Sequence, residues 1–163
     1  MEKSYLKGFG FGLTSGIITT LVMMIGLHSG THSRLAVLGG IFVIAVCDAF
    51  SDAMGMHVSE ESVHDGGEHK HKEVWGATIS TWFFKFFTAM LFVVPVLLLP
   101  LETAMIASVI GGLILISIFS YVLAKQQGNR PMHVVAEHVL ITFVVIVMTH
   151  YIGDFVNKFF GEA

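Results

Sequence analysis

The feature that most constrains the fold is a series of apolar runs, each about as long as a membrane is thick. A helix needs roughly 20 mostly apolar residues to cross the hydrocarbon core, and five such runs fill this chain of 163 residues. Charged residues make up only 13% of the chain, whereas soluble domains carry about 25%. We therefore expect an all-α integral membrane protein with one five-helix domain over residues 1–163. The expected spans are residues 9–27, 35–58, 74–100, 103–124 and 132–153.

The basic residues indicate how these helices are oriented. Six lie on one side of the expected membrane and two on the other, namely Lys3, Lys7, Lys70, Lys72, Lys125 and Arg130 against Arg34 and Lys158. By the positive-inside rule, the N-terminus faces the cytoplasm. No A-x-A cleavage site follows the first run, so we expect a retained helix rather than a signal peptide. The protein is then a multi-pass membrane protein, located in the cell membrane if it is prokaryotic.

Two carboxylates interrupt the second apolar run. Asp48 and Asp52 are four residues apart, which places them on one face of a helix, and Met56 continues that face. An aspartate at the centre of a membrane helix costs roughly 2.5–3.5 kcal/mol, so this pair does not face lipid. The two acids either pack between helices, protonated or hydrogen-bonded, or form a site for an ion or a proton. We favour the ion or proton site.

The first and third helices carry further features of interest. Gly8, Gly12 and Gly16 recur every four residues and predict a face that another helix approaches closely. Next to this face lies a weakly polar stripe of Ser15, Thr19 and Met23. In the third helix, Lys85 either extends to the membrane interface or pairs with a buried carboxylate. The single cysteine, Cys47, excludes a disulfide within the chain and is expected in the core.

Residues 59–73 form the only strongly polar stretch, which we expect to be a short cytoplasmic loop. Its carboxylates and imidazoles are typical ligands of divalent cations. Their spacing matches no closed zinc motif, so the stretch is either a loose metal-collecting site or a solvated charged loop. The candidate metal ligands are Glu60, Glu61, His64, Asp65, Glu68, His69, His71 and Glu73.

A metal-dependent membrane enzyme is one alternative function. Its centre would use His28, His32, Glu137, His138 and His150. In the expected topology these residues lie at opposite ends of the helices, which argues against one centre. His57, Glu137 and His138 remain secondary candidates for metal contact. The chain has no phosphate-binding glycine loop, no hydrolase signature and no basic patch for nucleic acid, so we expect no nucleic-acid partner.

Several local patterns, in order along the chain, resemble the vacuolar iron transporter family. The segment GLTSGIITT at residues 12–20 resembles the family's glycine-asparagine-aspartate-glycine segment in the first helix. The segment SDAMGMHVS at residues 51–59 is similar to the family's serine-methionine, glycine-glutamate and serine pattern at the end of the second. Pro95 with LLLP at 97–100, and YIG at 151–153, resemble the endings of the third and fifth helices.

The resemblance implies a homodimer that exports Fe²⁺ or Mn²⁺ from the cytoplasm in exchange for protons, along a path between the subunits. It also implies that Ser15 stands where the family has an aspartate, Asp52 where it has a methionine, and Met56 where it has a glutamate. The expected path is lined by Asp48, Asp52, Met56, Ser15, Thr19 and Met23. The metal ion is then a substrate, with no resident cofactor, and the other partners are the lipid bilayer and a second copy. A membrane metal sensor or adaptor that transports nothing is the other alternative.

Overall fold

The computed structural model describes residues 2–63 and 68–161, without the side chains of residues 2, 3 and 68–70. Its elements are all helical in these residues. In chain order they are α1 (Glu2–Thr31), α2 (Arg34–Val43), the π-helical turn η1 (Ile44–Asp48), α3 (Ala49–Val63), α4 (Glu68–Leu91), α5 (Val93–Leu98), α6 (Leu101–Gln126) and α7 (Pro131–Phe160).

Within the described residues, five helical segments are long and apolar enough to cross a membrane. They are Ser4–Thr31, Arg34–Val63, His71–Leu98, Leu101–Gln126 and Pro131–Phe160. Only 17–39% of each apolar window is buried inside the protein, so most of these side chains point outward. A soluble protein does not leave that much apolar surface uncovered. The predicted all-α chain with five apolar spans thus agrees with the structure.

The polar stretch at residues 59–73 is more helical than predicted. α3 continues to Val63 and α4 begins at Glu68, so most of the expected loop extends the two helices. The reason is that glutamate and lysine have high helix propensity and that helices can continue beyond the hydrocarbon core into water. The third predicted helix, in contrast, is interrupted at Phe92 between α4 and α5. Pro95 lacks the N–H that a continuous helix would require at this point.

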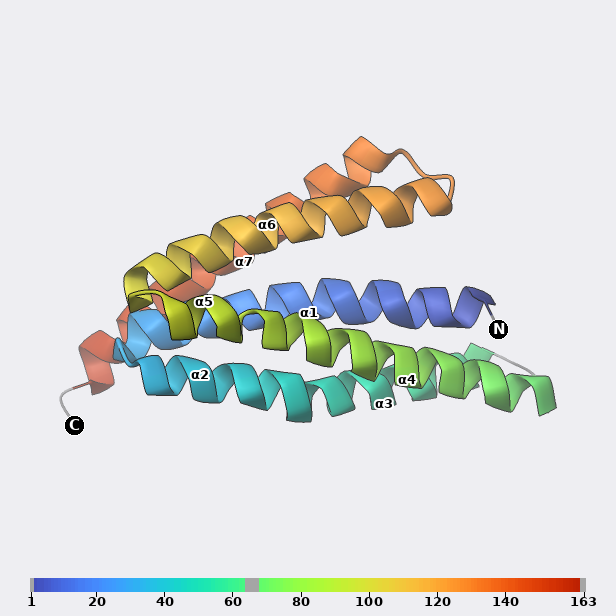
Figure 1. Ribbon diagram of the computed structural model, residues 1–163, viewed down its shortest axis with the longest axis horizontal. Coiled ribbons are helices and arrows are strands. Elements are labelled where there is room, and N and C mark those ends of the chain that lie inside the picture. Colours follow the sequence, from blue (N-terminus) through green and yellow to red (C-terminus); the bar gives the residue numbers. More distant parts are fainter. Residues whose placement is uncertain (1, 64–67, 162–163) are drawn as a thin grey trace.

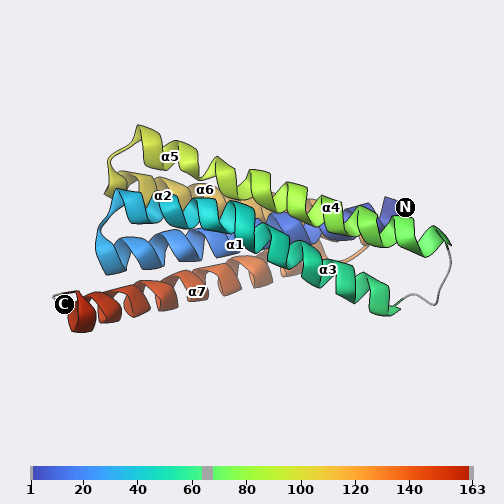
Figure 2. The same cartoon turned by 90° about the horizontal axis from the view of Figure 1, so that it is seen from below.

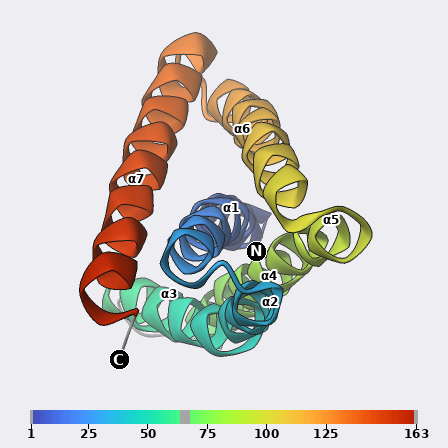
Figure 3. The same cartoon turned by 90° about the vertical axis from the view of Figure 1, so that its left-hand side faces the viewer.

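α1 lies at the centre of the bundle, with the other helices around it (Figure 3). It packs against α4, α7, α6 and α2. Figures 1 and 2 show the long helices running side by side, with the start of α1 at one end, called the N-terminal end here, and the end of α7 at the other, called the far end. Each of the four remaining spans therefore contacts α1.

The glycines of α1 determine how closely α4 approaches. A Cβ atom on Gly12 would lie 2.6 Å from the carbonyl oxygen of Thr81, and one on Gly16 would lie 3.1 Å from Cβ of Thr88. The predicted close helix approach is therefore confirmed, and the partner is α4 of the same chain.

A second close contact joins α1 to α7 near the far end. A Cβ atom on Gly153 would lie 2.6 Å from the carbonyl oxygen of Gly26 and 3.0 Å from the backbone nitrogen of Gly30. Small residues on both helices permit this spacing, as in other membrane bundles. Together the two glycine contacts hold α1 between α4 and α7.

Candidate functional site

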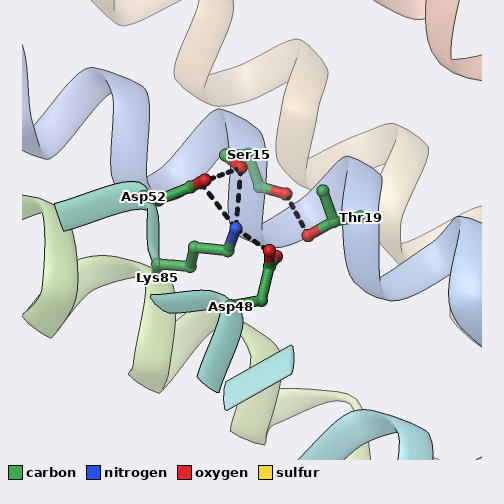
Figure 4. Close-up of polar contacts among 5 residues, drawn as sticks. All are labelled: Ser15, Thr19, Asp48, Asp52 and Lys85. Atoms are coloured by element: carbon green, nitrogen blue, oxygen red, sulfur yellow. Dashed lines mark hydrogen bonds and ion pairs between the residues drawn. The ribbon is translucent and has the colours of Figure 1, made fainter. Parts of the chain in front are cut away.

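The centre of the site is the ammonium group of Lys85 on α4. Its side chain is fully buried, with 0% exposure, inside a helix rich in aromatic residues. Lys85 Nζ forms ion pairs with Oδ2 of Asp48 and, at 2.5 Å, with Oδ2 of Asp52. It also donates a hydrogen bond of 3.0 Å to Ser15 Oγ (Figure 4). Of the two predicted roles for Lys85, pairing with buried carboxylates is confirmed and extension to the interface is wrong.

Ser15 connects the acids to α1. Its hydroxyl donates a hydrogen bond of 2.6 Å to Asp52 Oδ2 and accepts the one from Lys85. Thr19, one turn further along α1, donates to the backbone carbonyl of Ser15 at 2.7 Å (Figure 4). The Ser15 hydroxyl therefore has both its donor and an acceptor position in use, and its orientation is determined by the cluster.

A π-helical turn precedes the pair of acids. The backbone N–H of Ala49 reaches back five residues to the carbonyl of Ile44, which inserts one extra residue into the second span. Asp48 is the last residue of this turn, and Asp52 follows in the regular α3. Both carboxylates face the same ammonium, as their spacing predicts. π-turns of this kind occur frequently at functional sites. Cys47, expected in the core, is exposed on the outside of the bundle instead.

The cluster of Ser15, Asp48, Asp52 and Lys85 carries unbalanced charge. Two carboxylates face one ammonium, which leaves a formal charge of −1. The burial is also uneven, because the Lys85 side chain is sealed while those of Asp48 and Asp52 are 33% and 22% exposed. The cation thus lies on the inner side of the acids, and the outer side of the acids remains accessible.

A hollow of about 380 Å³ borders Asp48. Its lining comes from α1, η1 and α7 and includes Thr19, Val22, Met23, Gly26, Leu27, Ile44, Asp48 and Thr149. It leads along α1 from the level of the acids toward the far end. Three predicted path residues, Thr19, Met23 and Asp48, therefore meet in one cavity. The lining is mostly apolar, with the Asp48 carboxylate, the Thr19 hydroxyl and the Met23 thioether among its groups.

Met56 and His57 lie outside this cluster. Met56, one turn beyond Asp52 on α3, is half-buried. His57 contacts α4, with its Nδ1 3.0 Å from Thr78 Oγ1 and its ring edge-on to that of Trp75. Since the Thr78 hydroxyl already donates to the carbonyl of Val74, it accepts the hydrogen bond from Nδ1–H of His57. His57 thus links α3 to α4.

The predicted metal-collecting residues are only partly within the described structure. His64 and Asp65 lie outside the described residues, as do the side chains of Glu68 and His69. Glu61 and His71 are exposed, and Glu73 is half-buried. Glu60 is buried and forms an ion pair of 2.9 Å with Lys7 of α1. In the part of the chain that the structure describes, no three His, Cys, Asp or Glu side chains are arranged to hold a metal ion.

The five residues considered for an enzyme centre divide between the two ends of the bundle. Near the far end, the rings of His28 and His32 are 5.5 Å apart, and His150 Nδ1 lies 2.5 Å from Ser29 Oγ. Glu137 and His138 lie near the start of α7, where His138 Nδ1 is 2.7 Å from Ser120 Oγ. This separation agrees with the argument made from the topology.

Sequence reasoning identified both acids, Ser15, Thr19 and Met23, and it left Lys85 as an open choice. The signal that could have placed Lys85 in the site was the balance of charge. A lone lysine deep in an apolar span needs an anion, and the acids that lie deepest inside an expected span are Asp48 and Asp52. Comparison of the chain with protein-family models, curated proteins and solved structures finds no match.

Proposed function

We propose that this protein transports a divalent transition-metal ion, Fe²⁺ or Mn²⁺, across a membrane, with Asp48 and Asp52 as the cation-binding groups. The observation that carries the proposal is the convergence of two carboxylates and the Ser15 hydroxyl on one point inside the apolar spans, where a cation already lies. A set of oxygen ligands at that depth is costly to maintain in lipid, and such groups typically mark ion pathways.

The second carboxylate distinguishes an ion site from a packing contact. One aspartate would be enough to neutralise Lys85, and the additional one leaves the cluster with negative charge. An excess negative charge inside a membrane lowers the stability of the fold, so a packing role does not explain it. The same charge attracts a cation to the site. The thioether of Met23 in the adjoining hollow is a soft group, which suits Fe²⁺ or Mn²⁺ better than Ca²⁺.

The direction, the coupling and the oligomeric state belong to the same proposal. The distribution of lysine and arginine supports a cytoplasmic N-terminus and hence export from the cytoplasm, in exchange for protons. A homodimer is supported by the partial exposure of Asp48 and Asp52 on the outside of a bundle that faces lipid. A second copy placed there would cover both carboxylates and complete the wall of the hollow.

The test is metal entry into sealed proteoliposomes that contain a metal-quenched fluorophore, with Mn²⁺ or Fe²⁺ and with or without a pH gradient. A charged ligand contributes about 1.5–3 kcal/mol, so we expect Asp52→Asn to reduce the uptake rate at least about tenfold. The matched control is Asp154→Asn, because Asp154 is half exposed on α7 and lies outside the cluster. Its uptake should equal that of the wild type.

Two results would contradict the proposal. Uptake by Asp52→Asn at the wild-type rate would exclude Asp52 as a transport ligand. Absence of uptake by the folded wild-type protein, for every divalent ion tried, would favour the non-transporting sensor or adaptor. The ammonium that already occupies the oxygen ligands is the observation that keeps this second candidate in view.

A further inference from the structure

The position of Lys85 carries an inference beyond the assignment of the acids. Its Nζ is bound by three oxygens that come from two separate spans, Asp48 and Asp52 on the second and Ser15 on the first. These are the oxygen groups that a metal ion would use at this place. The ammonium therefore lies at the position of the proposed substrate.

The ammonium and a divalent ion cannot occupy this oxygen site at the same time. With Lys85 in place the cluster has a formal charge of −1, as two carboxylates face one ammonium. A divalent ion added beside the ammonium would change this to +1 and would place two cations on the same carboxylate oxygens. Apart from the two carboxylates, the surroundings of the cluster are apolar and have few anions. The repulsion between the two cations is therefore poorly screened. One of the two cations has to leave.

We propose that Lys85 is a built-in competitor, tethered to α4, that fills the cation site when it is empty and is displaced when a divalent ion binds. This inference rests on the proposed function and adds to it the residue that decides which ions enter. A monovalent ion that replaces the ammonium neutralises no additional charge, whereas a divalent ion neutralises both carboxylates. Lys85 thus favours divalent over monovalent ions and keeps the acids neutralised between transport events.

The route for the exchange is given by the uneven burial of the cluster. Lys85 reaches the acids from the sealed inner side, where its side chain has 0% exposure. The hollow is lined by Asp48 and not by Lys85. An ion in the hollow therefore reaches Asp48 without passing Lys85.

The experiment is equilibrium Mn²⁺ binding to the purified protein in detergent, comparing wild type with Lys85→Met, Lys85→Ala and Lys85→Arg. Lys85→Met removes the charge and preserves most of the side-chain volume, and it should bind Mn²⁺ at least tenfold more tightly than wild type. Lys85→Arg keeps a competing cation and should remain close to wild type. In Lys85→Ala, millimolar methylammonium should weaken Mn²⁺ binding, because it replaces the missing ammonium, and it should have little effect on wild type.

A purely structural role of Lys85 predicts a different pattern. It would give unchanged or weaker Mn²⁺ binding in Lys85→Met and no effect of methylammonium in Lys85→Ala, and this result would overturn the inference. If wild type still transports Mn²⁺ in that case, the proposed function stands without it. If neither the wild type nor any Lys85 variant binds Mn²⁺ while all elute as folded protein, the proposed function is wrong and the inference falls with it.

Discussion

Substitution of Gly12 by alanine tests whether the contact between α1 and α4 positions the site. The new Cβ would lie 2.6 Å from the carbonyl oxygen of Thr81 and 3.2 Å from the backbone nitrogen of Lys85. Non-bonded atoms prefer about 3.5–4.0 Å, so the two helices must separate by roughly 1 Å. Because the obstructing atoms belong to the backbone, no side-chain rotation can relieve the clash. Overpacking of this kind costs about 1–3 kcal/mol.

Alanine also has a higher helix propensity than glycine, by about 1 kcal/mol, and this gain partly hides the clash. The control variant Gly111→Ala removes the ambiguity. Gly111 lies inside α6, and a Cβ there would have no neighbour within 4 Å, so only the propensity gain applies. We expect Gly12→Ala to be less stable than Gly111→Ala by about 1–3 kcal/mol.

The assay is thermal unfolding of both variants and the wild type in the same detergent. For a chain of this size, 1 kcal/mol corresponds to about 2–4 °C in Tm, so the two variants should differ by about 2–12 °C. Equal Tm values for Gly12→Ala and Gly111→Ala would refute the reasoning, since they would mean that α4 does not approach α1 as closely as the structure has it.

Two further substitutions test other contacts of α1. Gly153→Ala should also lower the Tm relative to Gly111→Ala, because its Cβ would lie 2.6 Å from the carbonyl oxygen of Gly26; an unchanged Tm would argue against the contact between α1 and α7. Glu60→Gln should lower the stability by less than about 1 kcal/mol, since the Lys7 side chain is 53% exposed and water weakens the ion pair. A loss of several kcal/mol, measured by the same unfolding assay, would mean that this pair is a main link between α1 and α3.

Much of the architecture follows from local sequence patterns. The five apolar runs predict the five spans. Inside a membrane the backbone N–H and C=O groups have no water to bond, and an apolar run of this length satisfies them by forming a helix. The four-residue spacing of Asp48 and Asp52 predicts that they share a face, and both do contact the same ammonium. The glycine repeat predicts close packing of the first helix. Each of these inferences depends only on residues near one another in the chain.

The helix ends and irregularities were harder to predict. The stretch 59–73 is predicted as a loop, yet its glutamates and lysines are good helix formers. Packing of α3 against α4 accompanies the extension of both helices. The π-turn at Ile44–Asp48 has no signature in the sequence, because an extra residue in a helix is tolerated only where the surrounding helices accommodate it.

The sequence by itself determined that this chain is built from apolar helices and that charged side chains inside them need partners, because an isolated charge in lipid is too costly. It did not determine the partners. Only the tertiary structure brought Lys85 to Asp52, 33 positions away, and to Ser15, 70 positions away. The physical reason is that these contacts depend on which helix covers the glycine face of α1. That choice places α4, and with it the ammonium of Lys85, against the two acids.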